Sequence, residues 1–348
     1  MRKVKLYLVL CLYLVSATLN LFICGCSTQT DTDITDNIIM TNITEESPTT
    51  QLIEPEPTEK TEPTEPEREL DIDFDAESGI MEVFVFGIGK ADAILITTEN
   101  HTVLIDTGEN KHGPHIADYL LSRGITEIDY LIITHFHKDH VGGADTIIKN
   151  FGVKEVIVPN YGKESRHYAR FNAAMLAMRL ENSILTEITE FILDNSIFIL
   201  YPSQLEYREY SDMSDDEYDE DDEIEEENKP NENDFSIVVS VNHGDNYFLF
   251  AADATAERLD ELLSDENIVN TKYDFLKVPH HGKYNKRSLE FINAVSPKYA
   301  VITCSLDKPA DKKLISVLEE TKADVYLTTN GNIYCISGGN TLITKYIK

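Results

Sequence analysis

Short apolar runs alternate with amphipathic segments from about residue 80 to the end of the chain. Runs rich in β-branched and aromatic residues predict strands at Met81–Phe86, Ala93–Thr97, Thr102–Ile105, Tyr130–Thr134, Glu155–Val158, Ile197–Leu200, Ser236–Val241, Tyr247–Ala251, Phe275–Val278, Tyr299–Thr303, Val325–Thr328 and Ile333–Ile336. Helical spacing predicts helices at Ile116–Arg123, Arg166–Leu180, Ala256–Leu263, Ser288–Val295 and Pro309–Glu320. Strands mixed with amphipathic helices in both halves predict an α/β domain with two sheets and outer helices.

The first 78 residues lack this pattern. A basic start is followed by the apolar run Leu6–Ile23 and then by Ile23-Cys24-Gly25-Cys26, which resembles a bacterial lipobox. We therefore expect residues 1–25 to be a lipoprotein signal peptide and Cys26 to be lipidated. A plain secretory signal and an uncleaved membrane anchor are the alternatives, and all three export the chain.

Residues 26–78 are rich in Thr, Glu and Pro, as in the segment from Pro55 to Pro66. Frequent proline forbids a helix, and there is too little apolar surface to offset the entropy of ordering the chain. The sequence predicts a disordered tether here, followed by one folded domain over residues 79–348.

One short stretch concentrates candidate metal ligands. His135, His137, Asp139 and His140 follow a predicted buried strand, and Gly142-Gly143 follow them. Imidazole and carboxylate groups together suit zinc and neighbouring first-row metals. The sequence predicts a loop past the strand end, with the rings of His135 and His137 on the same side.

This H-x-H-x-D-H-x-G-G pattern resembles the signature of metallo-β-lactamase-fold hydrolases. Three further stretches fit that family: Leu104–Gly108, Phe248–Asp253 and Lys277–Gly282. Within the superfamily, Gly87–Ala93 and Asn233–Ser236 resemble segments of the extracellular domain of ComEC-type competence proteins. The resemblance implies a four-layer αββα sandwich with a two-metal site at one edge of the sheets.

The resemblance also implies roles for individual residues. His135 and His137 would bind a first metal ion, and Asp139, His140 and one of the pair His280-His281 a second, while Asp253 bridges them. Asp106 and Asp92 would accept hydrogen bonds from ligand imidazoles. Asp139 would also steer the proton of the nucleophile. Two zinc ions are expected, with manganese as the alternative.

The chain departs from the family pattern at one ligand. The histidine that commonly lies between the H-x-H motif and the bridging aspartate is missing, because His167 and His243 lack the expected flanking residues. Asn233, Asp234 or Ser236 could approach that position, directly or through water.

The charge of the chain limits which molecules it can bind. The formal net charge is −32, and twelve acids lie in Asp212–Glu227, inside an insertion at about residues 204–232. This charge argues against high-affinity nucleic-acid binding. The insertion is either a solvated loop or a flap that favours cationic substrates.

The predicted domain contains two cysteines. Cys304 and Cys335 are either a disulfide or two buried thiols.

Together these features predict a lipid-anchored, extracytoplasmic enzyme of the cell membrane. We expect a metal-dependent hydrolase that uses metal-activated water on phosphoester or phosphodiester substrates. The alternative is a non-catalytic metal- or ligand-binding lipoprotein of the same fold. A true β-lactamase is a third possibility with less support.

Overall fold

The computed structural model describes residues 75, 77–205 and 231–347, which belong to a compact unit assigned to Arg68–Lys348. The predicted signal peptide, Cys26, nearly all of the predicted tether and the acids of Asp212–Glu227 lie outside the described residues. Within the described ranges, no helix combines the length and the apolar character needed to cross a membrane.

Two sheets form the centre of the unit. The first has eight strands in the order β15 (Leu342–Ile347), β14 (Asn332–Ser337), β1 (Met81–Val85), β2 (Ile94–Thr97), β3 (Thr102–Ile105), β4 (Glu127–Ile132), β5 (Gly152–Pro159) and β6 (Asn182–Leu185). The second has seven, in the order β13 (Asp324–Leu327), β12 (Tyr299–Ile302), β11 (Phe275–Lys277), β10 (Asn246–Phe250), β9 (Val238–His243), β8 (Ser196–Tyr201) and β7 (Thr189–Leu193). Both sheets are mixed: β3 to β6 and β10 to β13 run parallel, and the remaining pairs are antiparallel.

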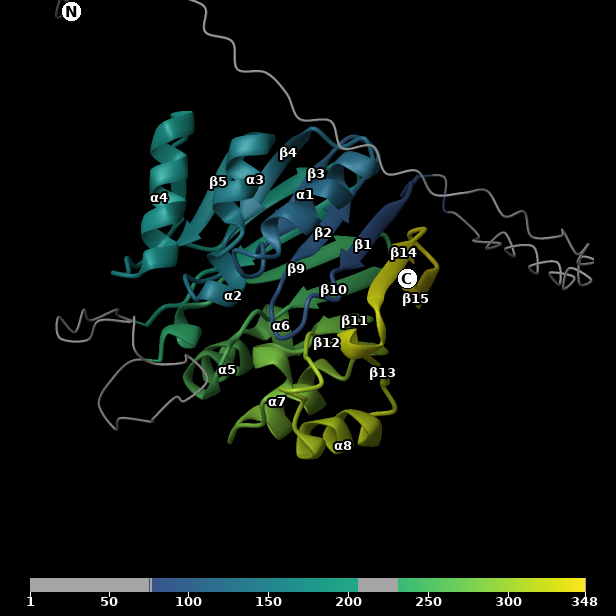
Figure 1. Ribbon diagram of the computed structural model, residues 1–348. Helices are drawn as coiled ribbons and strands as arrows, with labels where there is room; N and C mark the ends of the chain where they lie inside the picture. The colour runs from purple at the N-terminus through teal and green to yellow at the C-terminus, as the bar shows by residue number, and fades with distance from the viewer. Residues whose placement is uncertain (1–74, 76, 206–230, 348) are drawn as a thin grey trace, which may run out of the picture. The chain divides into compact units, whose positions relative to one another are not determined.

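Helices cover the outer face of each sheet (Figure 1). The first sheet packs against α1 (Gly113–Ser122), α3 (Ala144–Asn150) and α4 (Arg166–Met178). The second packs mainly against α5 (Ala256–Ser264), α7 (Ser288–Val295) and α8 (Lys312–Glu320). The shorter elements are α2 (Lys138–Val141), α6 (Glu266–Val269), η1 (Glu232–Phe235), η2 (Pro279–Gly282) and η3 (Thr328–Asn330). This is the αββα sandwich that the sequence predicts.

Strand β1 shows why its sequence is an almost unbroken apolar run. Val83 and Val85 join the core between the two sheets, whereas Phe84 and the following Phe86 pack with the helix-covered core. Successive side chains of a strand point to opposite faces, so a strand buried on both faces needs apolar residues at nearly every position.

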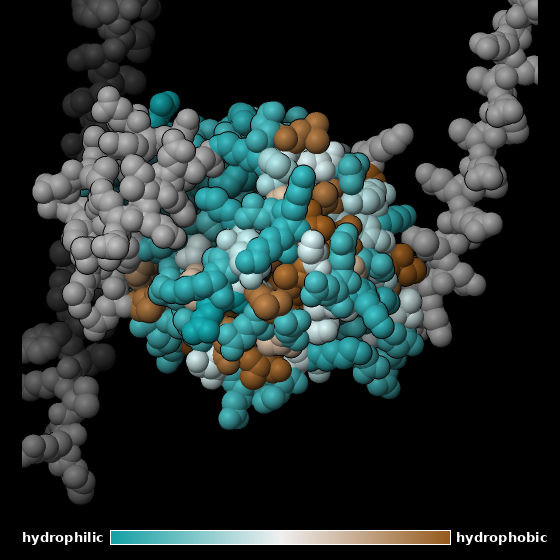
Figure 2. Space-filling model, turned by 90° about the horizontal axis from the view of Figure 1, so that it is seen from below, coloured by the Kyte–Doolittle hydropathy of each residue, from teal (hydrophilic) through white to brown (hydrophobic). Residues whose placement is uncertain are grey.

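The surface on the side of α7 and α8 is mostly polar (Figure 2). Figure 2 views the unit from the side of α7 and α8, and the coloured surface there is mainly hydrophilic with separate hydrophobic patches. In α8 the apolar residues Leu314, Val317 and Leu318 are buried. The helix therefore turns its apolar face towards the sheet and its charged face towards solvent.

The sequence missed several elements. Strands β6 and β7 lie at sheet edges and contain exposed and polar residues, so they lack the apolar run of a central strand. Strand β15, the other edge of the first sheet, was missed for the same reason. The short helices α2, α3 and α6 were also not predicted. Cys304 and Cys335 are buried free thiols in different core clusters, which decides against the disulfide.

Candidate metal centre

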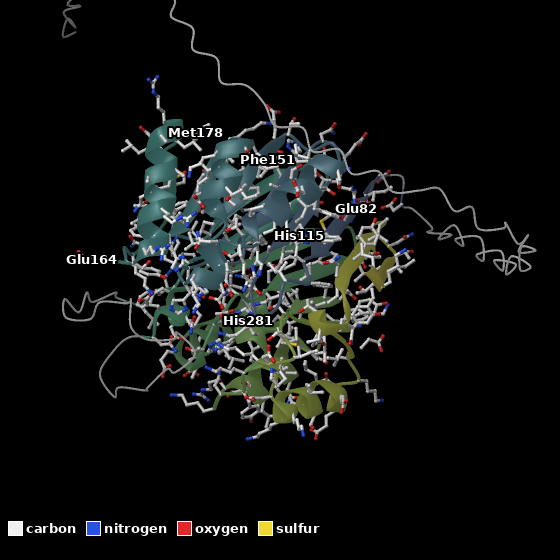
Figure 3. All side chains as sticks on the ribbon, in the orientation of Figure 1. Glu82, His115, Phe151, Glu164, Met178 and His281 are labelled. Atoms are coloured by element: carbon white, nitrogen blue, oxygen red, sulfur yellow. The ribbon has the colours of Figure 1, made fainter. Side chains whose placement is uncertain are left out.

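The candidate ligands come from four segments that meet at strand ends. His135 and His137 follow β4, and Asp139 and His140 lie on α2. Asp253 follows β10, and His281 lies on η2 after β11. Figure 3 shows His281 between the half that carries α1 to α4 and the half that carries α5 to α8. The prediction of a loop holds for His135 and His137 but is wrong for Asp139 and His140, which begin a helical turn.

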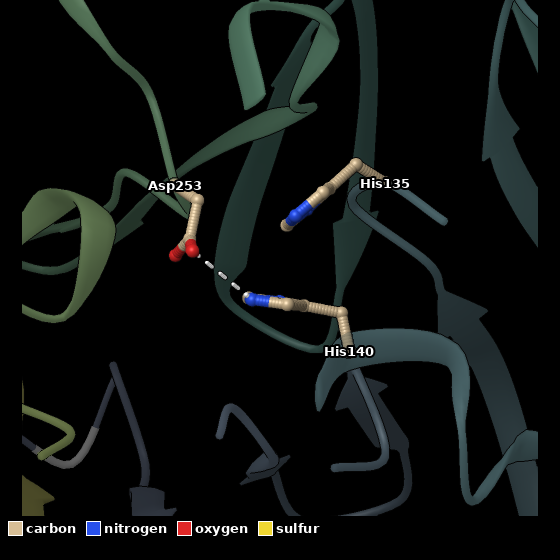
Figure 4. Close-up of side chains that lie close together, drawn as sticks. All are labelled: His135, His140 and Asp253. Carbon is tan, nitrogen blue, oxygen red and sulfur yellow. Dashed lines mark ion pairs between the residues drawn. The ribbon is translucent and has the colours of Figure 1, made fainter. Parts of the chain in front are cut away.

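Two overlapping sets of ligand atoms form the centre. In the first, His135, His140 and Asp253 place one ligand atom each within 4.8 Å of the others (Figure 4). In the second, Asp139, His140 and His281 do the same. Asp253 Oδ2 lies 3.3 Å from His140 Nε2 and 3.0 Å from His281 Nε2, so this carboxylate contacts members of both sets.

Hydrogen bonds fix which ring nitrogens face the centre. Asp106 Oδ2 lies 2.8 Å from His140 Nδ1 and also accepts a hydrogen bond from Thr134 Oγ1. The carbonyl oxygen of Thr303 lies 2.9 Å from His281 Nδ1, and Thr303 Oγ1 donates to Asp92 Oδ1. When Nδ1 donates a proton to such an acceptor, the Nε2 lone pair is left to bind a metal.

The donor set fits a divalent cation. The Nε2 atoms of His135, His140 and His281 are buried and make no well-formed hydrogen bond to the described part of the chain. Buried polar atoms normally have a partner. Imidazole nitrogens beside the carboxylates of Asp139 and Asp253 are the ligand types that zinc and similar metals take.

Electrostatics within the cluster hold the pKa values of Asp139 and Asp253 well below the ordinary value. Burial alone would raise the pKa of Asp253, but His281, His140 and Lys277 hold it well below its usual value. Burial also opposes charge on His140, yet Asp253 and Asp106 outweigh it and raise the pKa of His140 well above the ordinary value. The anionic carboxylates therefore attract a positive charge into the centre, either a proton on histidine or a metal ion.

The histidine pair is resolved in favour of its second member. His281 belongs to two of the ligand sets found among the described residues, and His280 to none. Both residues have left-handed backbone conformations, with φ of 48° and 50°, and their ring centroids are 6.5 Å apart. Burial lowers the pKa of His280 to about 3, so His280 is a buried neutral side chain beside the centre.

Lys277 is a site residue to which the sequence assigned no role. Its side chain is fully buried, and Nζ donates to the carbonyl oxygen of Ala252 at 2.8 Å. It also forms ion pairs with Asp92 and with Asp253 Oδ1. A lysine inside the apolar run Phe275–Val278 was the available signal, because a lysine is almost never fully buried without a partner.

The first metal position, where the family's third histidine is missing, differs from the expected ligand set. His137 is absent from the ligand sets of the described chain, and its Nε2 lies 3.6 Å from Glu232 Oε2. Asp234 is not directed to the centre, because it accepts hydrogen bonds from Thr255 Oγ1 and from Arg258 N at the start of α5. Asp234 belongs to no ligand set of the described residues.

The other candidates for that position also lie in the interior. Asn233 and Ser236 are buried on either side of Asp234. His167 contacts Asn110, and His243 contacts Ser78 and Ser337, so neither belongs to a ligand set in residues 77–205 and 231–347.

The two glycines of the motif allow close backbone packing. A Cβ atom on Gly142 would lie 2.3 Å from the carbonyl oxygen of Lys138 and 2.7 Å from Asn110 N. A Cβ atom on Gly143 would lie 2.3 Å from the carbonyl oxygen of Thr107. Glycine is needed at both positions for α2 to sit against the loop that carries Asp106.

Comparisons with known proteins agree with the motifs. The family description "Metallo-beta-lactamase superfamily" matches residues 87–305. ComE operon protein 3 of Bacillus subtilis (strain 168) is 25% identical over 278 residues, which are 72% of this chain and 32% of that protein. Recombination protein 2 of Haemophilus influenzae is 26% identical over 248 residues, 68% of this chain and 26% of that protein. The resemblance to ComEC-type proteins is confirmed, and the chain spans about a third or less of these relatives.

The metallo-beta-lactamase fold protein YhfI from Bacillus subtilis covers 71% of this chain and 96% of its own, with a TM-score of 0.46 and 10% identity.

Proposed function

Because the chain belongs to the metallo-β-lactamase superfamily, we propose that it is a metal-dependent hydrolase of small phosphoester or phosphodiester substrates. The observation that carries this proposal is the convergence of three buried Nε2 atoms on the carboxylates of Asp139 and Asp253. The relatives support the general class, since members of the superfamily are mostly metal-dependent hydrolases.

Each candidate residue has its own role in the proposed reaction. His135 and His137 would hold a first ion, Asp139, His140 and His281 a second, and Asp253 would contact both. Bound zinc or manganese would supply an activated water molecule and polarise the substrate. Asp139 would accept the proton of the nucleophile, and its Oδ2 lies 3.4 Å from His281 Nε2 and 3.6 Å from Lys90 Nζ. Asp106 would hold the ring of His140 in place.

The charges near the centre favour a small anionic substrate. Lys90 lies beside Asp139, and Lys163 lies beside Glu232, which is a neighbour of His137, so two ammonium groups lie near the candidate ligands. They could contact the non-bridging oxygens of a phosphoryl group. The net charge of −32 and the acids of Asp212–Glu227 oppose a long polyanion over about a Debye length, ~8 Å at physiological salt.

The protein, purified without chelator, should hydrolyse bis(4-nitrophenyl) phosphate when zinc or manganese is supplied. We expect weak cleavage of DNA and negligible turnover of a cephalosporin, measured side by side at equal enzyme concentration. Deleting residues 212–227 should raise DNA cleavage more than phosphodiester hydrolysis, because only the polyanion is repelled strongly. A preference for the cephalosporin, or efficient DNA cleavage by the intact chain at low salt, would contradict the proposal. Metal binding without any turnover would favour the alternative of a binding lipoprotein.

We also propose that the chain is anchored to the outer face of the cell membrane through Cys26. The apolar run Leu6–Ile23 and the small residue Gly25 before Cys26 support this. Cys26→Ala should leave the precursor uncleaved or release it into the medium, as seen by mass spectrometry and fractionation. An unchanged mass and unchanged membrane retention would argue against lipidation there.

A further inference from the structure

We infer that Glu232 is the third protein ligand of the first metal position, where the family pattern has a histidine. This inference rests on the proposed function, since it concerns the same centre. Glu232 belongs to none of the motifs recognised in the sequence. A carboxylate oxygen is a harder ligand than the imidazole nitrogen that it replaces.

The distance between the two side chains suits a shared ion. Glu232 Oε2 lies 3.6 Å from His137 Nε2. Two ligand atoms bound tetrahedrally at about 2.0–2.1 Å from zinc are about 3.3–3.4 Å apart. Only a small movement of either side chain would therefore let one ion contact both. The ring centroids of His137 and His135 are 4.7 Å apart, so the first histidine of the motif lies beside His137.

The backbone holds Glu232 at this place from both sides. The side chain of Asn231 accepts a hydrogen bond from Asn233 N at the start of η1. Asp234 accepts hydrogen bonds from Thr255 Oγ1 and Arg258 N, which ties η1 to the first turn of α5. These hydrogen bonds support the backbone on both sides of Glu232, as a metal ligand requires.

Lys163 is the positioning residue for this carboxylate. Its Nζ lies 3.2 Å from Glu232 Oε2, and its side chain is only 6% exposed. The ammonium group stabilises the ionised carboxylate, which is the form that binds a metal. The Glu232 side chain is 22% exposed, so this ion pair is less solvated than one between fully exposed surface residues.

The test compares Glu232→Gln and Glu232→His with two controls. Lys163→Met removes the partner of the carboxylate, and Glu164→Gln removes an exposed acid from the same loop as Lys163. Each full-length protein is loaded with zinc or manganese. The number of metal ions per chain is measured by elemental analysis. The Kd of the more weakly bound ion is measured by competition with a chelator.

We expect Glu232→Gln to weaken one metal position at least tenfold, and Glu232→His to restore zinc binding more than manganese binding. Lys163→Met should weaken it less than Glu232→Gln does, and Glu164→Gln should match the wild type. A loss below tenfold for Glu232→Gln overturns the inference, as does an equal loss for Lys163→Met. If Glu232→Gln fails to fold, the zinc-to-manganese preference of Glu232→His decides, and an unchanged preference overturns it.

Failure of this inference is distinguishable from failure of the proposed function. A wild type that binds metal and loses it in His135→Ala, but not in Glu232→Gln, leaves the metal centre intact and removes only the role of Glu232. A wild type that binds no metal overturns both.

Discussion

His140→Ala should abolish metal-dependent hydrolysis and lower the metal content by at least one ion per chain. His140 belongs to three of the four ligand sets found in the described residues, more than any other histidine. Replacing a partner that only orients a ligand costs about 10–100-fold in metal affinity or activity, so loss of the ligand itself should cost more than about 100-fold. Elemental analysis and phosphodiester hydrolysis measure the two effects separately.

His101→Gln is the matched control for that variant. His101 precedes β3 at the end opposite Asp106, and its ring pairs with Asp129 at 3.3 Å, outside every ligand set of the described chain. It should retain full metal content and activity. If the two variants behave alike, or if His140→Ala keeps its metal, the convergent cluster is not a metal centre.

The sequence was sufficient for the parts of the fold in which the local pattern determines the structure. Strands such as β1 are buried on both faces, so their apolar runs could be recognised without knowing their neighbours. The metal-binding motif could be recognised because four candidate ligands, His135, His137, Asp139 and His140, lie within six residues. The edge strand β6 has exposed residues at most positions and gives no such signal.

Three features of the site depend on distant segments and could not be predicted. His280 and His281 are adjacent and chemically identical, and only the left-handed turn decides which ring faces the centre. Glu232 follows closely after the acidic run Asp212–Glu227, so nothing in its composition marks it. Lys277 is buried with Asp92, from the loop before β2, and Asp253, from the turn after β10, as its ion-pair partners.

Lys277→Met should strongly destabilise the metal-free protein. The methionine leaves the buried carboxylates of Asp92 and Asp253 without their ammonium partner. Breaking a buried ion pair by removing one partner typically costs about 3–5 kcal/mol. In a unit of this size each kcal/mol lowers Tm by about 2–4 °C. Thermal and urea unfolding of chelator-treated protein would measure the loss.

The double variant Lys277→Met/Asp92→Asn separates loss of packing from loss of charge balance. Removing the charge of Asp92 as well should recover part of the stability, because the penalty comes from the uncompensated charge and not from the missing lysine stem. Lys286→Met removes an exposed lysine that pairs with Glu257, and it should leave Tm unchanged. If the double variant is no more stable than Lys277→Met, the lysine acts through packing alone. Added metal should then restore little of the lost stability. If the unbalanced charge of Asp253 is the cause instead, a bound cation should restore part of it.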